Sequence, residues 1–575
     1  MHSWIRWTRR LLIGVAVLVS ALAIAAWLTL RASLPLLDGD IAIKGLSAPV
    51  RIVRDAGGTV TIEASNERDA MRALGYVHGQ ERFFEMDLMR RLVAGELAGL
   101  FGPAALPTDR AHRKDRLRER VKANLEAALD GRRDVAQAYA DGVNSGLGAL
   151  SARPWTYVLL RQAPRAWRIE DTPLVGYAMY YDLQDASDAR ERSLAEVLPH
   201  LPQALRALVT RDGTSWDAPL EGAARGDASL PGAKDIDLRG WSTAATRLVR
   251  EPSRREVGSN NFAVAGRLTA DGRAILADDM HLGLRAPNIW FRARLRYADA
   301  AAAGGHVDVN GFTLPGLPGV VVGSNTHVAW GFTNSYGDWV DWITVPGCTV
   351  AACPQARTYR ESIPVAGGED AALDVQETQW GPIDRFDASG NAVARRWVAH
   401  LPGALNLGVL RMARAASLDA AMRTADRIAI PAQNMLVADA AGRIGWRLLG
   451  PMPQRSSGCN AAGVSDGAAC PPWPISTAHA PMLVDPPSAR LWTANARVTD
   501  GDDLRRIGDG GYVLAVRAHM IRDDLAARSR FTERDLLAVQ LDDRSLFLQR
   551  WATLMHAAAA STRGGSALRA LDLGP

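Results

Sequence analysis

The spacing of hydrophobic residues changes near the middle of the chain. In residues 67–102 apolar side chains recur at steps of three and four, which predicts helix, and Gly102-Pro103 ends the run. The same spacing predicts helices in residues 116–129, 134–150 and 169–185, the last with Asp171 as a candidate N-cap. Before them, residues 41–64 alternate apolar and polar positions around two glycines and predict a β-hairpin.

Strand patterns dominate from residue 260 onward. They predict strands in residues 261–268, 274–279, 289–297, 306–314, 319–324, 328–334 and 341–345, and again within 434–450. One helix is predicted between them, in residues 417–429. Residues 218–255 are rich in Gly, Ala, Pro, Ser and charge with weak patterns, which is typical of a linker. We therefore expect an α+β protein with a helical first part and a sheet-rich second part.

The N-terminus carries an export signal. Residues 11–30, "LLIGVAVLVSALAIAAWLTL", contain no charge and are long enough to cross a bilayer as a helix. Arg6, Arg9 and Arg10 precede them, so the remainder of the chain is predicted to be exported. The small residues of "ALAIAA" suit a signal peptidase, so residues 1–35 are either a signal sequence or a retained anchor. We expect a periplasmic protein, held at the inner membrane if the segment is not removed.

Composition narrows the function classes. The 575 residues are 47% apolar and carry a net charge of only +5, with no run that combines basic and aromatic residues. A nucleic-acid groove is therefore not expected. The four cysteines all follow the export segment and suit disulfides in an oxidising compartment. Local pairs, Cys348–Cys353 and Cys459–Cys470, are one pairing, and the crossed pairing remains open.

The stretch "GSNNFAVAGRLTADGRAILADDMHLGL", residues 258–284, suggests the chemistry. The chain has no G-x-S-x-G elbow, no H-E-x-x-H, no P-loop and no G-x-G-x-x-G after a strand. If the bond before Ser259 is cut, the α-amine of Ser259 is a base with a reference pKa near ~7.7–8.0, placed beside its own hydroxyl. Gly258, with no side chain, allows that hydroxyl to approach its carbonyl. We therefore predict cleavage between Gly258 and Ser259.

The same stretch resembles the penicillin acylase family of N-terminal-nucleophile hydrolases at the start of the large subunit. Further blocks match in the family's order, in residues 75–113, 138–147, 311–342, 430–455, 491–498 and 536–545. The resemblance covers nearly everything after the apolar segment. It implies a four-layer α/β/β/α sandwich beside a helical small-subunit region, and a hydrolase that acts on linear amides.

Catalytic roles follow from the resemblance. Ser259 would be nucleophile and base. The backbone N–H of Asn334 and the side-chain amide of Asn434 would stabilise the oxyanion. His281 would orient the amine or line the substrate site, and Arg455 falls at the family's arginine near the active-site network. The family takes N-acyl amides, including β-lactam side chains and acyl-homoserine lactones, and its acyl preference depends on a pocket for which residues 177–184 are a candidate wall.

The resemblance also implies one structural Ca²⁺ ion per molecule. In "SYGDWVDW", Asp338 and Asp341 would supply carboxylates and Val340 a backbone carbonyl. A further acid is expected from the small subunit, for which Asp188 or Asp185 is the candidate. Oxygen ligands of this kind suit Ca²⁺.

These expectations divide the chain into four segments. They are residues 1–35, a signal or anchor; 36–217, the small subunit; 218–258, a spacer; and 259–575, the large subunit. The cut chain would be a heterodimer of its own subunits. Family members run well past the length of this chain, so we expect a C-terminally truncated large subunit. The alternative is an unprocessed, inactive envelope protein that keeps the fold as a binding or scaffold module.

Overall fold

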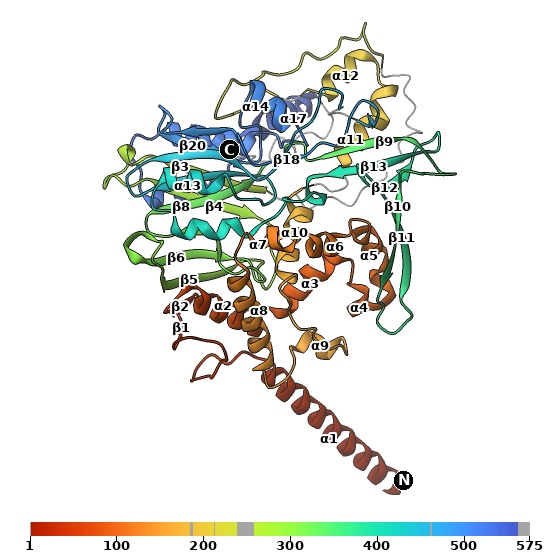
Figure 1. Ribbon diagram of the computed structural model, residues 1–575, viewed down its shortest axis with the longest axis vertical. Helices are drawn as coiled ribbons and strands as arrows, with labels where there is room; N and C mark the ends of the chain where they lie inside the picture. The colour runs from red at the N-terminus through yellow and green to blue at the C-terminus, as the bar shows by residue number, and fades with distance from the viewer. Residues whose placement is uncertain (1, 185–187, 212, 238–257, 460–462, 562–575) are drawn as a thin grey trace.

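The computed structural model describes residues 2–184, 188–211, 213–237, 258–459 and 463–561 (Figure 1). The helices of the first part are α2 (Glu67–Glu81), α3 (Phe83–Ala94), α4 (Ala98–Phe101), α5 (Leu106–Arg113), α6 (Leu117–Ala123), α7 (Leu125–Leu129), α8 (Arg133–Gly148), α9 (Trp155–Leu159), α10 (Asp171–Leu183), α11 (Ala189–Val197) and α12 (Gln203–Val209). Helix α2 packs along α8, and α10 packs against α3. The candidate N-cap Asp171 is itself the first residue of α10, one position later than predicted.

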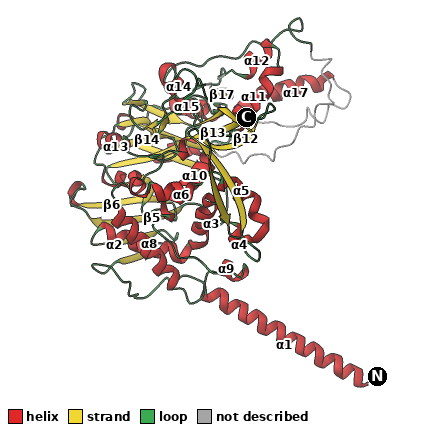
Figure 2. Cartoon of the chain, turned by 45° about the vertical axis from the view of Figure 1, so that its right-hand side comes forward, coloured by secondary structure: helices red, strands yellow, loops and turns green. Residues whose placement is uncertain are grey.

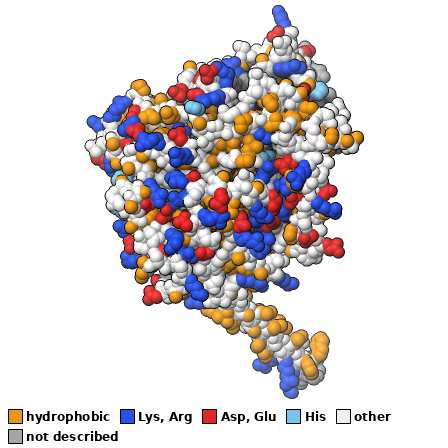
Figure 3. All heavy atoms as spheres, viewed as in Figure 1, with side chains coloured by type: hydrophobic (Ala, Val, Ile, Leu, Met, Phe, Trp, Pro, Cys, Tyr) orange, Lys and Arg blue, Asp and Glu red, His pale blue; other side chains and the backbone are white. Residues whose placement is uncertain are grey.

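Helix α1 (His2–Ala32) projects from the body of the protein (Figures 1 and 2). Residues Trp4–Ala32 are long and apolar enough to cross a membrane, and the most apolar part of this stretch is not buried against the rest of the chain. Its side chains are largely hydrophobic, with basic side chains at the tip (Figure 3). The helix is compatible with a signal or an anchor segment.

A nine-stranded sheet forms the centre of the molecule, in the order β1-β2-β5-β6-β7-β8-β14-β15-β19. Its strands are β1 (Arg51–Arg54), β2 (Val60–Ala64), β5 (Phe291–Ala298), β6 (His306–Thr313), β7 (Val320–Ser324), β8 (Val328–Asn334), β14 (Gln433–Asp439), β15 (Ile444–Leu449) and β19 (Met482–Val484). Strand β2, from the first part of the chain, pairs in parallel with β5. The hairpin predicted in residues 41–64 is thus present with shorter arms, and it extends the sheet of the second part.

A three-stranded sheet lies across the central one, in the order β20-β3-β4. Its strands are β3 (Gly258–Val264), β4 (Ile275–His281) and β20 (Arg490–Thr493). One face of β3 and β4 contacts β8 and β14. On the other face, Phe262 and Val264 pack against α15 (Val516–Ala526) and α16 (Glu533–Gln540). Helix α13 (Leu418–Ala425) packs against β14 and β15.

A six-stranded sheet, β10-β11-β12-β13-β9-β17, extends to one side, and β16 pairs with β18 (Figure 1). These strands are β9 (Val340–Thr349), β10 (Arg357–Ile363), β11 (Ala371–Thr378), β12 (Gly381–Phe386), β13 (Asn391–Trp397), β16 (Met452–Pro453), β17 (Ser465–Asp466) and β18 (Ile475–Ser476). The remaining helices are α14 (Gly501–Ile507) and α17 (Gln549–Ser561). Disulfides join Cys348 to Cys353 and Cys459 to Cys470, so the pairing is local.

Candidate active site

Ser259 is the second residue of β3 and is 5% exposed. Its hydroxyl accepts hydrogen bonds from the backbone N–H of Asn334 at 3.2 Å and from Nδ2 of Asn495 at 3.1 Å. Its backbone N–H donates to Oδ1 of Asn495 at 2.6 Å. A buried serine hydroxyl therefore lies at the ends of three strands, with donors directed at it from β8 and from the loop after β20.

Asn495 uses its whole side-chain amide. Oδ1 accepts from Ser259 N–H and from Nη2 of Arg517 at 2.9 Å, and Nδ2 donates to Ser259 Oγ and to the carbonyl of Asn334 at 3.0 Å. Each oxygen lone pair and each N–H has a partner, which fixes the orientation of the amide. The residue is fully buried and has a φ of 66°, a conformation uncommon outside glycine. The sequence analysis did not select Asn495, although it stands in the matched block 491–498.

Asn334 and Asn434 lie close together because β8 and β14 are antiparallel neighbours, with Asn434 opposite Thr333 and Gln433 opposite Asn334. The side chain of Asn334 is held by the carbonyl of Leu183 and by Gln433, so its backbone N–H is the group that faces Ser259. Asn434 is 2% exposed, and its Oδ1 accepts from the indole of Trp446 at 3.1 Å. Its buried Nδ2 has no hydrogen-bond partner among the described residues, and a buried donor of that kind is costly unless a ligand uses it.

His281 stands opposite Gly258 in the β3–β4 pairing, and its Nε2 lies 2.8 Å from Oδ2 of Asp279. A Cβ atom at Gly258 would lie 3.3 Å from Nδ1 of His281 and 3.2 Å from Nη2 of Arg517. A larger residue would therefore crowd both groups, which explains glycine at this position. The flanking residues Met280 and Leu282 line the cavity described next, whereas the His281 side chain contacts Asp279 and the space beside Gly258.

A cavity of about 90 Å³ opens beside Ser259. Its walls are almost entirely apolar, and the polar residues that reach it are Ser259, Asn334, Asn406 and Gln433. The apolar lining comes from α10, β4, β8 and the segments around residues 290, 314–321, 405–410 and 430, and comprises Gly176, Met179, Leu183, Met280, Leu282, Trp290, Leu314, Leu317, Val321, Phe332, Leu405, Leu407, Val409, Leu410, Ile430 and Pro431. The site can therefore bury an uncharged, apolar group next to the serine.

The candidate wall formed by residues 177–184 contributes only in part. Met179 and Leu183 line the cavity, as does Gly176 just before them. Tyr177 and Tyr180 instead stack on each other, with the Tyr180 hydroxyl bonded to the carbonyl of Ala404. The tyrosines are core residues because they lie on the other side of α10.

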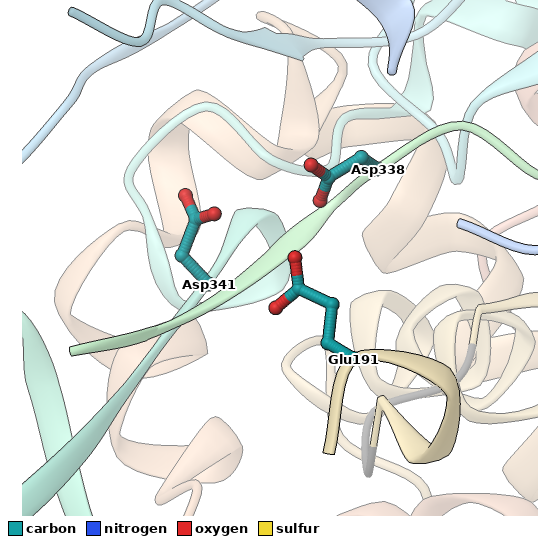
Figure 4. A group of neighbouring side chains, drawn as sticks. All are labelled: Glu191, Asp338 and Asp341. Carbon is teal, nitrogen blue, oxygen red and sulfur yellow. The ribbon is translucent and has the colours of Figure 1, made fainter. Parts of the chain in front are cut away.

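A second cluster lies a few residues beyond Asn334. Carboxylate oxygens of Glu191, Asp338 and Asp341 lie within 4.8 Å of one another and all three side chains are buried (Figure 4). Both oxygens of Glu191, Oδ2 of Asp338 and Oδ1 of Asp341 have no hydrogen-bond partner among the described residues. Burial, with the neighbouring acids, raises the pKa of Glu191 far above its ordinary value and that of Asp338 to about 8. Such a group of oxygens is a candidate cation site.

Arg455 belongs to this cluster. Its guanidinium donates to Oδ1 of Asp338 at 2.7 Å and to Oδ2 of Asp341 at 2.8 Å, and it also reaches the backbone carbonyl of Asp338. Trp473 donates to the same oxygen of Asp341. The structure therefore brings Arg455 to the acidic residues and not into hydrogen-bonding contact with Ser259. Val340 borders the small cavity beside these acids.

The sequence analysis missed Glu191. Asp188 is the N-cap of α11, where its Oδ1 accepts from the N–H of Glu191 at 3.4 Å, and it borders the same cavity. Asp185 lies outside the described residues. The spacing of Asp188 and Glu191, an acidic N-cap followed three residues later by Glu, is a helix-start signature that places Glu191 in the first turn. That pattern could have directed attention to Glu191.

Comparison with known proteins gives a consistent picture. Penicillin acylase 2 proenzyme of Pseudomonas sp. (strain SE83) is 30% identical over 535 residues, covering 90% of this chain and 67% of that protein. Acyl-homoserine lactone acylase QuiP of Pseudomonas aeruginosa is 27% identical, covering 90% of this chain and 63% of that protein. This chain therefore spans about two thirds of the length of these curated relatives.

A crystal structure of thermostable penicillin G acylase from Alcaligenes faecalis aligns with a TM-score of 0.44 and 19% identity, over 54% of this chain and 58% of that one. The family model for penicillin amidase matches residues 49–573, nearly everything after the apolar helix. The chain belongs to the penicillin amidase family.

Proposed function

We propose that this protein is an exported amidohydrolase that cuts itself between Gly258 and Ser259 and then hydrolyses linear amides of N-acyl compounds through an acyl-enzyme on Ser259. The two stacked sheets and the helices outside them would form the four-layer α/β/β/α core of an N-terminal-nucleophile hydrolase. The observation that carries the proposal is the buried Ser259 hydroxyl, which faces backbone and amide donors at the end of an apolar cavity. Membership of the family supports the same conclusion.

In the self-cleavage, Ser259 Oγ attacks the carbonyl carbon of Gly258. The bond between that carbon and Ser259 N breaks, the nitrogen takes the hydroxyl proton, and an ester joins Gly258 to Ser259 Oγ. Water then hydrolyses the ester and leaves a carboxyl group on Gly258 and a free amine on Ser259. The absence of a side chain at Gly258 keeps the space around this bond open.

In substrate hydrolysis, the Ser259 amine accepts the hydroxyl proton as Oγ attacks the amide carbonyl. The oxyanion would be stabilised by the N–H of Asn334 and by the otherwise unpartnered Nδ2 of Asn434. The proton passes from the Ser259 amine to the leaving amine as the C–N bond breaks. Water then attacks the acyl-serine ester and releases the acid, with the Ser259 amine again accepting and returning a proton.

The apolar cavity indicates the acyl groups that would bind. The named relatives include a penicillin acylase and acyl-homoserine lactone acylases, and for this chain we propose N-acyl compounds of the same kind. Because the described walls carry no charged side chain, a charged acyl group would be buried without a partner. We expect hexanoyl and phenylacetyl p-nitroanilides to be hydrolysed, and the glutaryl compound to show a kcat/KM at least about tenfold lower.

The test uses the purified 575-residue chain. A denaturing gel should show two fragments, and N-terminal sequencing of the larger one should begin at Ser259. The anilide panel then gives kcat/KM for each acyl group. A chain that stays whole and hydrolyses no amide would favour the scaffold alternative, and hydrolysis by an uncut chain would contradict the mechanism. A preference for the glutaryl compound would contradict the assignment of the cavity.

We also propose that Glu191, Asp338 and Asp341 hold a structural Ca²⁺ ion, with Val340 and Asp188 beside it. The donors fit, because buried carboxylate oxygens without partners are the ligands that this ion prefers. The charges fit as well: three carboxylates and the guanidinium of Arg455 leave two negative charges for a divalent cation. When bound, the ion would supply charge compensation that lets all three acids ionise together.

Removal of calcium should make stability depend on pH. Without the ion, folded Glu191 and Asp338 keep protons that the unfolded chain releases near ordinary carboxyl pKa values of about 4. The free energy of unfolding then falls as pH rises from about 4 toward 8, because the folded state binds more protons than the unfolded state. Calcium replaces these protons, so we expect it to raise the melting temperature more at pH 8 than at pH 5.5.

Thermal melts in EDTA and in CaCl₂ measure this effect. At a concentration 100 times its dissociation constant, calcium should add about 2.7 kcal/mol to the free energy of unfolding. Glu191→Gln should remove most of the calcium effect, while the exposed control Glu369→Gln should keep it. An equal calcium effect in both variants would mean that the ion binds elsewhere.

A further inference from the structure

One arginine reaches the back of the Ser259 strand from the outer helix layer. Arg517, on α15, donates through Nη1 to the backbone carbonyl of Ser259 at 2.8 Å and to Oδ1 of Asn260 at 2.5 Å. Its Nη2 donates to Oδ1 of Asn495 at 2.9 Å, the same oxygen that accepts the N–H of Ser259. A single planar guanidinium thus holds the main chain of Ser259 and also the side chain that contacts its nitrogen and its hydroxyl.

The deduced catalytic cycle gives these contacts no role, yet they surround the atoms that react. We propose that Asn495 and Arg517 are positioning residues that hold the freed amine of Ser259 beside its own hydroxyl and oppose protonation of that amine. The inference rests on the proposed function, since an amine exists at Ser259 only after the chain is cut.

Asn495 would act through geometry. Its Oδ1 accepts one N–H of Ser259, and its Nδ2 donates to the oxygen that must become the nucleophile. Because Asn334 N–H also donates to that oxygen, the hydroxyl proton of Ser259 is left to point toward another acceptor. The amine nitrogen, bound to the same residue and turned by its hydrogen bond to Asn495, is the acceptor next to it.

Arg517 would act through charge. Its Nη2 shares an acceptor with the Ser259 nitrogen and lies 3.2 Å from where a Cβ of Gly258 would be, so its positive charge is close to the freed amine. A nearby cation disfavours the ammonium form, which keeps more of the amine available as a base at neutral pH. An arginine is suited to this place because it stays charged and its fork of donors reaches three oxygens at once.

The other titratable groups around Ser259 come from β4. Asp279 lies on the face that carries Asn260 and is hydrogen bonded to His281, which lowers the pKa of the Asp279 carboxyl. Asp278 is opposite Asn261 on the inner face, and burial raises its pKa well above the ordinary value, so it adds little charge at neutral pH. Strands β8 and β20 present no ionisable side chain to Ser259. Arg517 is therefore the cation that hydrogen bonds directly to this residue.

The test compares Arg517→Gln and Arg517→Lys with the wild type, all as full-length purified chains. The pH dependence of kcat/KM on an N-acyl anilide is measured per cut chain, determined by gel and active-site titration. The neutral amine is the active form, so kcat/KM falls on the acid side of its pKa. We expect Arg517→Gln to shift this acid limb upward by about one pH unit or more, because the opposing charge is gone.

Arg517→Lys should leave the acid limb near its wild-type position and lower kcat at least about tenfold, because one ammonium cannot hold all three oxygens. The control Arg522→Gln, on the same helix and paired with Asp523, should match the wild type in both respects. A purely structural role for Arg517 would lower the amount of folded protein without moving the acid limb.

The outcomes separate the two proposals. If the wild type stays uncut and inactive, the proposed function is wrong. If the wild type is cut and active, an unchanged acid limb in Arg517→Gln overturns the inference alone, as does a folded Arg517→Gln chain that is not cut, because the charge would then serve cleavage and not the amine. If Arg517→Gln does not give a cooperative thermal melt, Arg517→Lys decides: wild-type kcat overturns the inference, and a loss with an unmoved acid limb supports it.

Discussion

Ser259→Ala remains a single chain and hydrolyses N-acyl anilides at less than about 10⁻⁴ of the wild-type rate, which is the largest effect that we expect from one substitution. The variant lacks the hydroxyl that would attack the Gly258 carbonyl, so the amine is never released. Nucleophile and base are therefore lost together. A denaturing gel, mass spectrometry of the 258–259 junction and an anilide assay measure the result.

The folded state of this variant should be intact, because Ser259 contributes only a small buried hydroxyl and its N–H still reaches Asn495. A thermal melt in calcium checks this. Ser389→Ala, at an exposed turn, is the matched control and should be cut and active. If Ser259→Ala is cleaved at the same junction, or hydrolyses amides at the wild-type rate, the nucleophile is a different residue.

Asn434→Ala should lower kcat by about 10²- to 10³-fold with little change in KM, equivalent to about 2.7–4 kcal/mol of lost transition-state stabilisation. The reason is that Nδ2 of Asn434 is buried without a partner in the described part of the chain, whereas Oδ1 is held by Trp446. The free donor would find its acceptor only when an oxyanion forms. Steady-state kinetics per cut chain, at saturating and limiting substrate, measure the effect.

Asn310→Ala, an exposed asparagine on β6 of the same sheet, is the control and should leave kcat unchanged. If Asn434→Ala keeps kcat within about threefold of the wild type, Asn434 does not face the oxyanion. A large rise in KM with an unchanged kcat would likewise contradict the assignment, because it would mean that the amide binds substrate and transition state equally.

Local pattern predicted many of the elements. The strand predicted in residues 328–334 is β8 with the same bounds, because its β-branched and aromatic residues suit a buried strand. The run 67–102 was predicted as one helix, but the structure divides it into α2, α3 and α4. Gly95 ends α3 in a left-handed conformation with a φ of 61°, which is a common helix C-terminus. Apolar spacing continues across such breaks, so periodicity alone does not reveal them.

The candidate site divides in a similar way. Ser259, Asn334 and Asn434 stand in contiguous stretches that carry the family resemblance, and the structure brings Ser259 to the Asn334 N–H. Asn495 and Arg517 reach Ser259 from more than 230 residues further along the chain. Their role depends on how the loop after β20 and helix α15 dock on β3. No spacing within their own segments encodes that docking, so residue patterns could not identify them.

The parallel pairing of β2 with β5 affects what happens after the chain is cut. Backbone hydrogen bonds sew a strand from before the scissile bond into the middle of the sheet built after it, so breaking one covalent link would leave the two fragments interlocked. Their separation would require the shared sheet to come apart. Reassembly from denaturant would then be a second-order reaction whose yield falls on dilution, whereas the uncut precursor folds as one molecule.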